Sequence, residues 1–218
     1  MIQNYLLKIS YTLFLTEYIY MILIFTLIIF LLLVGCKELP TPIDQQKYML
    51  LLNQEPLQHM LLQKKELKIK NFDIEIVAEY KIAALVLGKE KYYFSHEASL
   101  VPIDLALGWG VMADKKKLTD SNIKITQGGR FYRWWVPDFN VLNAQDIAHH
   151  SANTHIIPAN SIVNSYLSSV TEGDYIYMEG YLVNFKSKEK TFSTSLTRSD
   201  VEAGACEILL VNKIIHII

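Results

Sequence analysis

Three of the six histidines of this chain lie close together in the stretch DIAHHSANTHIIPANS, residues 146–161. They are His149, His150 and His155. Neutral imidazole is a ligand for zinc, copper and nickel, and it also acts as a general base near neutral pH. The stretch therefore raises three alternatives: a metal site, the base that activates a nucleophile, or a polar loop ahead of a helix.

The spacing of these histidines does not favour a metal site. His150 and His155 are five positions apart, whereas two ligands on one helical face are four apart, as in His-Glu-x-x-His. That motif is absent from the sequence, and no second cluster of Cys and His completes a ligand set. We predict no metal ligands and no cofactor.

Nucleophilic chemistry would use the cysteine in GAGACEILLV. Cys206 as nucleophile, His150 as base and Asn153 or Asp200 as the orienting group would follow the logic of Cys-His-Asn enzymes. A single cysteine at the start of an apolar strand is, however, most often a small buried hydrophobic residue.

A serine nucleophile is the other candidate for catalysis. Ser151 directly follows His150, but sequence neighbours rarely face one another in a strand, and no Gly-x-Ser-x-Gly turn is present. An envelope hydrolase or metal-dependent enzyme that uses His150 with Cys206 and Arg198 remains the alternative function.

The reading that we favour for the histidine stretch is structural. Ser, Asn and Thr side chains hydrogen-bond to nearby backbone and stabilise loops, and Asn160 or Ser161 can cap the helix that follows. This predicts a polar loop between an aromatic strand and a short helix. Arg198 and Asp200 can form a local ion pair across a turn.

A binding surface is predicted by the aromatic stretch RFYRWW, residues 130–135. Aromatic rings combined with guanidinium groups suit sugars, peptides or peptidoglycan fragments. The candidate binding residues are Arg130, Arg133, Trp134, Trp135, His150, Asn153, His155, Arg198 and Asp200.

The N-terminal region indicates a membrane segment. Residues 18–34 carry no charge, and as a helix they would reach about 25 Å, slightly less than the roughly 30 Å hydrocarbon core of a bilayer. The stretch LVGCKE, residues 33–38, directly follows and resembles the lipobox of bacterial lipoproteins. This resemblance implies cleavage before Cys36 and lipidation of its sulfur, which would anchor the protein to the bacterial cell membrane on its extracytoplasmic side. Because no Asp follows Cys36, the outer membrane is the expected location if the source has one.

Composition limits the partners. The chain has 218 residues, 51% of them hydrophobic, and a net charge of −1. There is no basic field of the kind that binds nucleic acid, so we expect no nucleic-acid partner. After Cys36 only Cys206 remains, and one thiol cannot form an internal disulfide.

The pattern of apolar residues predicts a mostly β body behind the membrane segment. Residues 1–35 are expected to be a signal peptide or membrane segment, residues 36–65 a lipidated cysteine, tether and short helices, and residues 66–218 one β-rich domain. Alternation in LKIKNFDIEIV and in the C-terminal third predicts strands, and residues 160–170 carry one apolar helical face. The fold class is mainly β with short helices (α+β), as a small barrel similar by analogy to OB or SH3 folds.

Several stretches also resemble an uncharacterised family of exported bacterial proteins. They are HSANTHIIPAN, GDYIYMEGYLV and SLTRSDVEAGACEILLV, with EPLQ and DLALGWG upstream. The family typically carries HSANxHxIPA, GD…EGYLV and SLTRxD…GACE in this order. One departure is KTFSTSLT, where many relatives have Trp and a basic residue. The resemblance implies export but no particular activity.

Together these observations predict a bacterial envelope lipoprotein that is a non-enzymatic binding or structural module. The expected partners are the membrane, through the lipid on Cys36, and an envelope protein or cell-wall glycan.

Overall fold

The computed structural model describes residues 18–26, 42–188, 190–197 and 205–217. The chain divides into two compact units, Met1–Pro40 and Thr41–Ile218. In the first unit, residues 18–26 are helical. Among the described residues, no helix has the length and apolar character needed to cross a membrane. Cys36 and the rest of the predicted lipobox lie outside the described residues.

The second unit is mainly β with short helices, which confirms this part of the prediction. Its strands are β1 (Leu57–Ile69), β2 (Phe72–Lys91), β3 (Ile103–Gly108), β4 (Lys124–Gly128), β5 (Phe131–Trp135), β6 (Ser151–Pro158), β7 (Tyr175–Ser187), β8 (Lys190–Phe192) and β9 (Glu207–Ile217). Its helices are α2 (Pro42–Leu51), α3 (Lys115–Ser121), α4 (Ala144–His150) and α5 (Ser161–Ser169), with short 3-10 turns η1 (Glu97–Ser99) and η2 (Gly110–Ala113).

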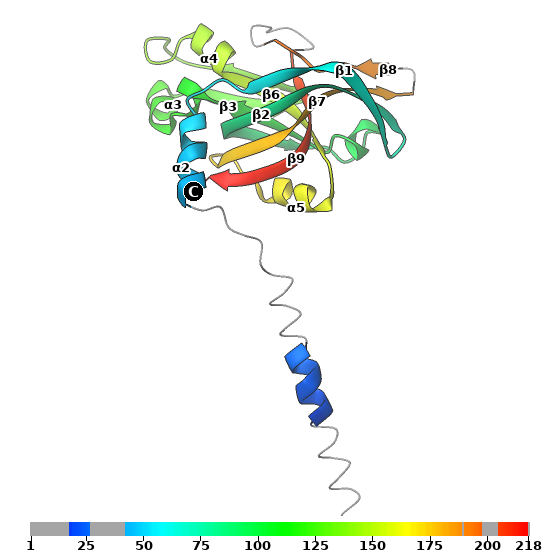
Figure 1. The fold of residues 1–218 in the computed structure, drawn as a ribbon. Helices are drawn as coiled ribbons and strands as arrows, with labels where there is room; N and C mark the ends of the chain where they lie inside the picture. Colours follow the sequence, from blue (N-terminus) through cyan, green and yellow to red (C-terminus); the bar gives the residue numbers. More distant parts are fainter. Residues whose placement is uncertain (1–17, 27–41, 189, 198–204, 218) are drawn as a thin grey trace, which may run out of the picture. The chain divides into compact units, whose positions relative to one another are not determined.

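Seven strands form one large mixed sheet in the order β1-β2-β3-β6-β9-β7-β8 (Figure 1). All pairs are antiparallel except β6 with β9, which run parallel. The 20-residue strand β2 pairs with β1 and β7 along its first part and with β3 at its end. Within this sheet, five neighbouring strands follow the order β2-β3-β6-β9-β7, and the first of them, β2, also pairs with the last, β7. The sheet as a whole is nevertheless not a clear barrel.

The main hydrophobic cluster lies inside this run of strands. It takes buried side chains from β2, β3, β6, β7 and β9, and Val163 and Leu167 add the apolar face of α5. The Asn160 side chain accepts a hydrogen bond from the Val163 backbone N–H at 2.9 Å and caps α5. The helix predicted at residues 160–170 is therefore confirmed. In Figure 1 it lies beside β9.

The segment between β3 and β6, residues 109–150, packs on the opposite face of the sheet. It contains η2, α3, the separate two-stranded β4–β5 hairpin and α4. Its apolar side chains join a second cluster, to which α2 contributes Tyr48, stacked on Tyr177 with ring centroids 4.4 Å apart. As a result, β3 and β6 are covered on both faces.

The structure corrects the expected boundary between tether and domain. Residues 57–65 were expected to lie among short helices, but β1 begins at Leu57. Pro56 prevents a helix from continuing into this stretch, and the strand then pairs with β2. Because Leu57 and Met60 are exposed, β1 lacks the buried alternation that marks a strand in a sequence.

The polar loop predicted around the histidines is regular structure, and so is the apolar run upstream of it. The apolar IDLALG is strand β3, buried at every position, and the histidine stretch is the end of α4 followed directly by β6. Strands that are buried on both faces show no apolar–polar alternation. The polar residues of β6 were mistaken for a loop because their partners come from a distant hairpin.

A close contact between β7 and β9 gives a test of the fold. A Cβ atom on Gly180 would overlap the backbone carbonyl oxygen of Leu210, whereas one on Gly128 would meet nothing within 4 Å. We expect Gly180→Ala to lower the free energy of unfolding by at least about 2 kcal/mol, and Gly128→Ala to lower it by less than about 1 kcal/mol. Urea unfolding of both variants measures this. Equal stability of the two would contradict the register of β7 against β9.

Candidate functional site: a buried carboxylate beneath a hairpin

A carboxylate and an imidazole face each other on the sheet beneath the hairpin. Asp104 in β3 pairs directly with His155 in β6, so the two side chains lie on the same face. The Asp104 side chain is 1% exposed, and its Oδ1 lies 2.9 Å from His155 Nδ1. A carboxylate removed from water in this way needs a positive partner.

The third member of this group comes from the turn of the β4–β5 hairpin. Arg130 donates from one terminal nitrogen to Asp104 Oδ1 at 2.7 Å and from the other to the Val101 carbonyl oxygen at 2.9 Å. Its guanidinium stacks on the Tyr92 ring, 3.6 Å from the centroid. Gly129 and Arg130 both have positive φ, 61° and 71°, as two-residue hairpin turns require. We call Asp104, Arg130 and His155 the Asp104 cluster.

The Asp104 cluster changes the titration of its neighbours. Burial alone would lower the pKa of His155, but hydrogen bonding to Asp104 and Cys206 and the charges of both groups raise it to about 9. Burial, with the negative charge of Asp104, raises the pKa of Tyr92 to about 12. His155 is therefore a cation at neutral pH, and Tyr92 keeps its proton.

A second polar row runs beside the Asp104 cluster. The Asn153 side chain accepts from Gln127 Nε2 at 2.8 Å and donates to the Arg130 carbonyl oxygen at 3.2 Å. It also lies 3.8 Å from the sulfur of Cys206, which is partly exposed and unpaired with another cysteine. Nearby, the hydroxyls of Tyr132 and Ser151 are 2.7 Å apart. The polar side chains of β6 thus hold the hairpin in place.

A cavity of about 570 Å³ opens beside this cluster. It is lined by Ser95, Glu97, Val101, Gly129, Arg130, Phe131, His155, Phe185, Lys190, Phe192 and Ile208. Its walls are mostly apolar, and Phe185 and Phe192 stack with centroids 4.5 Å apart. The size and lining are those of a site for a small molecule.

The structure separates the predicted catalytic residues. His150 ends α4, its Nδ1 lies 2.8 Å from the Asp146 carbonyl oxygen, and its ring packs over Gly110. No contact joins it to Cys206 among the described residues. Ser151 is buried and donates to the Ile147 carbonyl oxygen at 2.6 Å, so it is held as a structural group. In the described part of the chain, His150 and Ser151 thus hydrogen-bond to the backbone of α4, and Ser151 also to Tyr132, whereas His155 interacts with the thiol of Cys206.

The predicted binding residues divide between two sides of the hairpin. Arg130 points toward the sheet with Asn153 and His155, whereas Arg133 and Trp135 are exposed on the outside. Trp134 is partly buried and packs with the second hydrophobic cluster. Arg198 and Asp200 lie outside the described residues.

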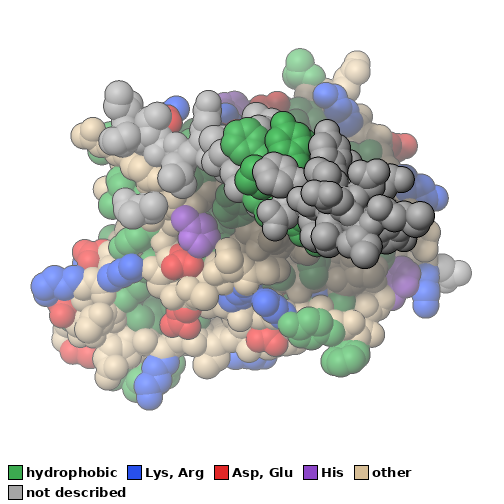
Figure 2. All heavy atoms as spheres, turned by 90° about the horizontal axis from the view of Figure 1, so that it is seen from below, with side chains coloured by type: hydrophobic (Ala, Val, Ile, Leu, Met, Phe, Trp, Pro, Cys, Tyr) green, Lys and Arg blue, Asp and Glu red, His purple; other side chains and the backbone are tan. Residues whose placement is uncertain are grey.

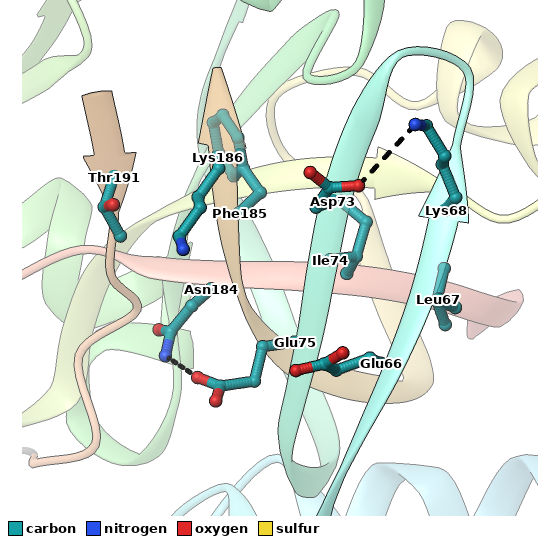
Figure 3. A pocket seen from close by; sticks show the side chains of 10 residues that line it. All are labelled: Glu66, Leu67, Lys68, Asp73, Ile74, Glu75, Asn184, Phe185, Lys186 and Thr191. Carbon is teal, nitrogen blue, oxygen red and sulfur yellow. Dashed lines mark hydrogen bonds and ion pairs between the residues drawn. The ribbon is translucent and has the colours of Figure 1, made fainter. Parts of the chain in front are cut away.

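Other charged regions are less suitable as sites. In Figure 3, ten residues of β1, β2, β7 and β8 line a hollow of about 460 Å³. Two of its carboxylates already have partners, since Asp73 pairs with Lys68 and Glu75 accepts a hydrogen bond from Asn184. Figure 2 shows acidic and basic side chains interspersed over the described surface of one face. In the described part of the chain, no three His, Cys, Asp or Glu residues are placed to hold a metal ion.

Sequence reasoning missed part of the site. Asp104, Tyr92 and Gln127 were not selected, although each contacts a residue that was. The signal for Asp104 was a single acid within an apolar run, VPIDLALG. A charge there indicates either a strand edge or a buried ion pair.

Searches of known protein families, of curated proteins and of solved structures give no significant match for this chain.

The raised pKa of His155 predicts how stability depends on pH. The pKa of His155 is about 9 in the folded protein, against 6.5 for an unperturbed histidine. The stabilisation that the charged imidazole gives to the folded state is therefore complete below pH 6.5 and is lost as the pH rises toward 9. At about 1.4 kcal/mol per pH unit, the loss is at most roughly 3 kcal/mol. Urea unfolding between about pH 6 and pH 10 should show this loss in the parent protein.

The matched variants are His155→Gln and His149→Gln, since His149 is exposed on α4. His155→Gln should flatten the pH profile, and His149→Gln should leave it unchanged. A profile for His155→Gln with the same slope as the parent would show that His155 is not the titrating group.

Proposed function

We propose that this protein is a bacterial envelope lipoprotein, anchored through Cys36, that binds a small amphipathic anion in the cavity beside the Asp104 cluster. The single observation that carries the proposal is a mostly apolar cavity with cationic side chains at one part of its wall. The proposal keeps the non-enzymatic binding role expected from the sequence. It replaces the cell-wall glycan with a ligand that has an apolar body.

We further propose that the run β2-β3-β6-β9-β7 is an OB-like barrel. Its support is that β2 pairs with β7 and that all five strands contribute to one interior cluster. OB folds bind ligands on the face of their second and third strands and on the loops that follow the first and fourth. The corresponding parts here include β6 and residues 92–102 and 190–197, which supply His155, Val101 and Lys190, among others, to the cavity wall.

The charges around the cavity favour an anion. Among the lining residues, Arg130, His155 and Lys190 are basic and only Glu97 is acidic, while Asp104 lies beneath Arg130 and His155. Arg130 already uses both terminal nitrogens in the protein. Lys190, and His155 through the part of its ring that lines the cavity, are the groups expected to contact a carboxylate or phosphate, while Phe131, Phe185 and Phe192 contact the apolar part.

Binding of dodecanoate tests this proposal. The unit Thr41–Ile218 has its own hydrophobic core and is used without the membrane segment. Dodecanoate should displace anilinonaphthalene sulfonate, a fluorescent amphipathic anion, from one site per chain. Because a hydrogen bond to a charged group contributes about 1.5–3 kcal/mol, His155→Gln should weaken binding by roughly tenfold or more.

The control is His149→Gln, which removes an exposed histidine outside the cavity and should bind dodecanoate like the parent. Equal affinities for the two variants would contradict the assigned site. Binding of a soluble muropeptide, but not of dodecanoate, would favour the glycan ligand instead.

A second candidate function is thiol chemistry at Cys206. The observation that favours it is that His155 interacts with both Asp104 and Cys206, as in a Cys-His-Asp arrangement. The Cys206 sulfur would add to the carbonyl carbon of an ester, the alcohol would leave with a proton from His155, and water would then hydrolyse the acyl-enzyme. Asn153 would donate a hydrogen bond to the sulfur.

Alkylation by iodoacetamide tests this candidate, because Cys206 is the only cysteine in residues 41–218. An imidazolium beside the sulfur stabilises the thiolate, which is the reactive form. We therefore expect the parent to be alkylated at pH 7 at least about fivefold faster than His155→Gln. His149→Gln should react like the parent. Equal rates for all three proteins would eliminate His155 as the partner of the thiol.

A further inference from the structure

The β4–β5 hairpin has an outer face, of which only Phe131 also lines the proposed cavity. It consists of the five exposed side chains Lys124, Thr126, Phe131, Arg133 and Trp135. Phe131 is 48% exposed and Trp135 is 56% exposed, although both are large and apolar. We call this surface the outer face of the hairpin.

The arrangement of the outer face combines aromatic rings with positive charge. Lys124 pairs with Trp135 across the two strands, and its Nζ lies 5.7 Å from the Trp135 ring. Arg133 pairs with Thr126, and a shallow hollow of about 530 Å³ lies among these side chains and Trp134. None of the five side chains of the outer face is acidic. Its charge therefore complements an anionic surface.

We propose that the outer face of the hairpin docks on an anionic phospholipid bilayer. Trp and Phe favour the interfacial region of a bilayer, and Lys and Arg beside them are attracted to anionic headgroups. The inference rests on the proposed lipid anchor and deepens the proposed function, because Phe131 belongs to both the outer face and the cavity wall. Docking would bring the cavity next to the membrane that holds an amphipathic ligand.

The length of the tether supports a bilayer over a soluble partner. Only residues 37–41 separate the predicted lipidated Cys36 from the start of α2 at Pro42. Six residue steps span at most about 20 Å when fully extended. An anchored domain therefore stays at the membrane surface, where even weak interfacial contacts are repeatedly formed.

Tryptophan quenching by brominated phospholipids tests the docking. The chain has three tryptophans, of which Trp109 is 2% exposed, Trp134 is partly buried and Trp135 is exposed. The full chain is reconstituted in vesicles of brominated phosphatidylcholine, with or without phosphatidylglycerol. We expect quenching that is stronger with phosphatidylglycerol, falls at high salt and is lost in Trp135→Phe.

Charge variants give the matched comparison. Lys124→Glu and Arg133→Glu should each lower the ratio of docked to undocked protein, by about fivefold for each positive charge lost. Lys65→Glu makes the same charge change at an exposed position of β1 and should leave quenching unchanged. Circular dichroism and flotation with the vesicles confirm that each variant is folded and anchored.

Three results would overturn the inference. A chain that does not float with vesicles would remove the proposed anchor and the docking with it. Flotation without quenching of Trp135 would remove the docking alone and leave the anchor and the cavity standing. A shift in Trp135 fluorescence with a soluble acidic glycan, without quenching by brominated lipid, would assign the outer face to a glycan.

Discussion

The buried carboxylate of Asp104 is the interaction on which the arrangement of the site depends. An ionised side chain that is 1% exposed is costly by several kcal/mol unless positive groups compensate it. One of the two compensating groups, His155, comes from the neighbouring strand, but the other, Arg130, comes from the turn of a separate hairpin. The hairpin must therefore reach the sheet before Asp104 Oδ1 has both of its positive partners. Arg130 even adopts a left-handed backbone conformation to do so.

The covering of β3 and β6 by the hairpin produces both the rigidity and the cavity of the site. Gln127 and Tyr132 of the hairpin bond to Asn153 and Ser151 of β6, so the contact between the layers is polar and directional. Such contacts fix one position for the hairpin, whereas apolar packing alone tolerates small shifts. The turn of the hairpin, at Gly129 and Arg130, forms one part of the cavity wall, and the hairpin does not cover the sheet beyond this turn.

The sequence predicted the helix near residues 160–170 and the strands of the C-terminal third, and it missed β3 and β6. The helix near residues 160–170 carries an amphipathic period, because one side contacts the core and the other meets water. The strands of the C-terminal third were predicted from local alternation and turn residues, although β7 and β9 are largely buried on both faces. Strands β3 and β6 have no such period, and their polar residues have partners more than twenty positions away. Pairing of this kind depends on tertiary structure, which a local pattern does not encode.

Four of the predicted site residues nevertheless come together. Arg130, Asn153, His155 and Cys206 were selected for their chemistry, and the structure brings them around one acid that was overlooked. The choice between His150 and His155 could not be made from spacing. It depends on His150 ending a helix while His155 lies within a strand opposite Asp104.

The charge of His155 discriminates between the two proposed functions. A general base must be neutral to accept a proton, and a pKa of about 9 keeps this imidazole protonated at neutral pH. In a thiol mechanism, His155 could give a proton to the leaving alcohol, but the imidazole would then have to stay neutral until water attacks the acyl group, which a pKa of about 9 disfavours at neutral pH. An imidazolium that a buried carboxylate keeps charged at neutral pH is better suited to an anion that binds and leaves unchanged. The same residue therefore favours binding over turnover.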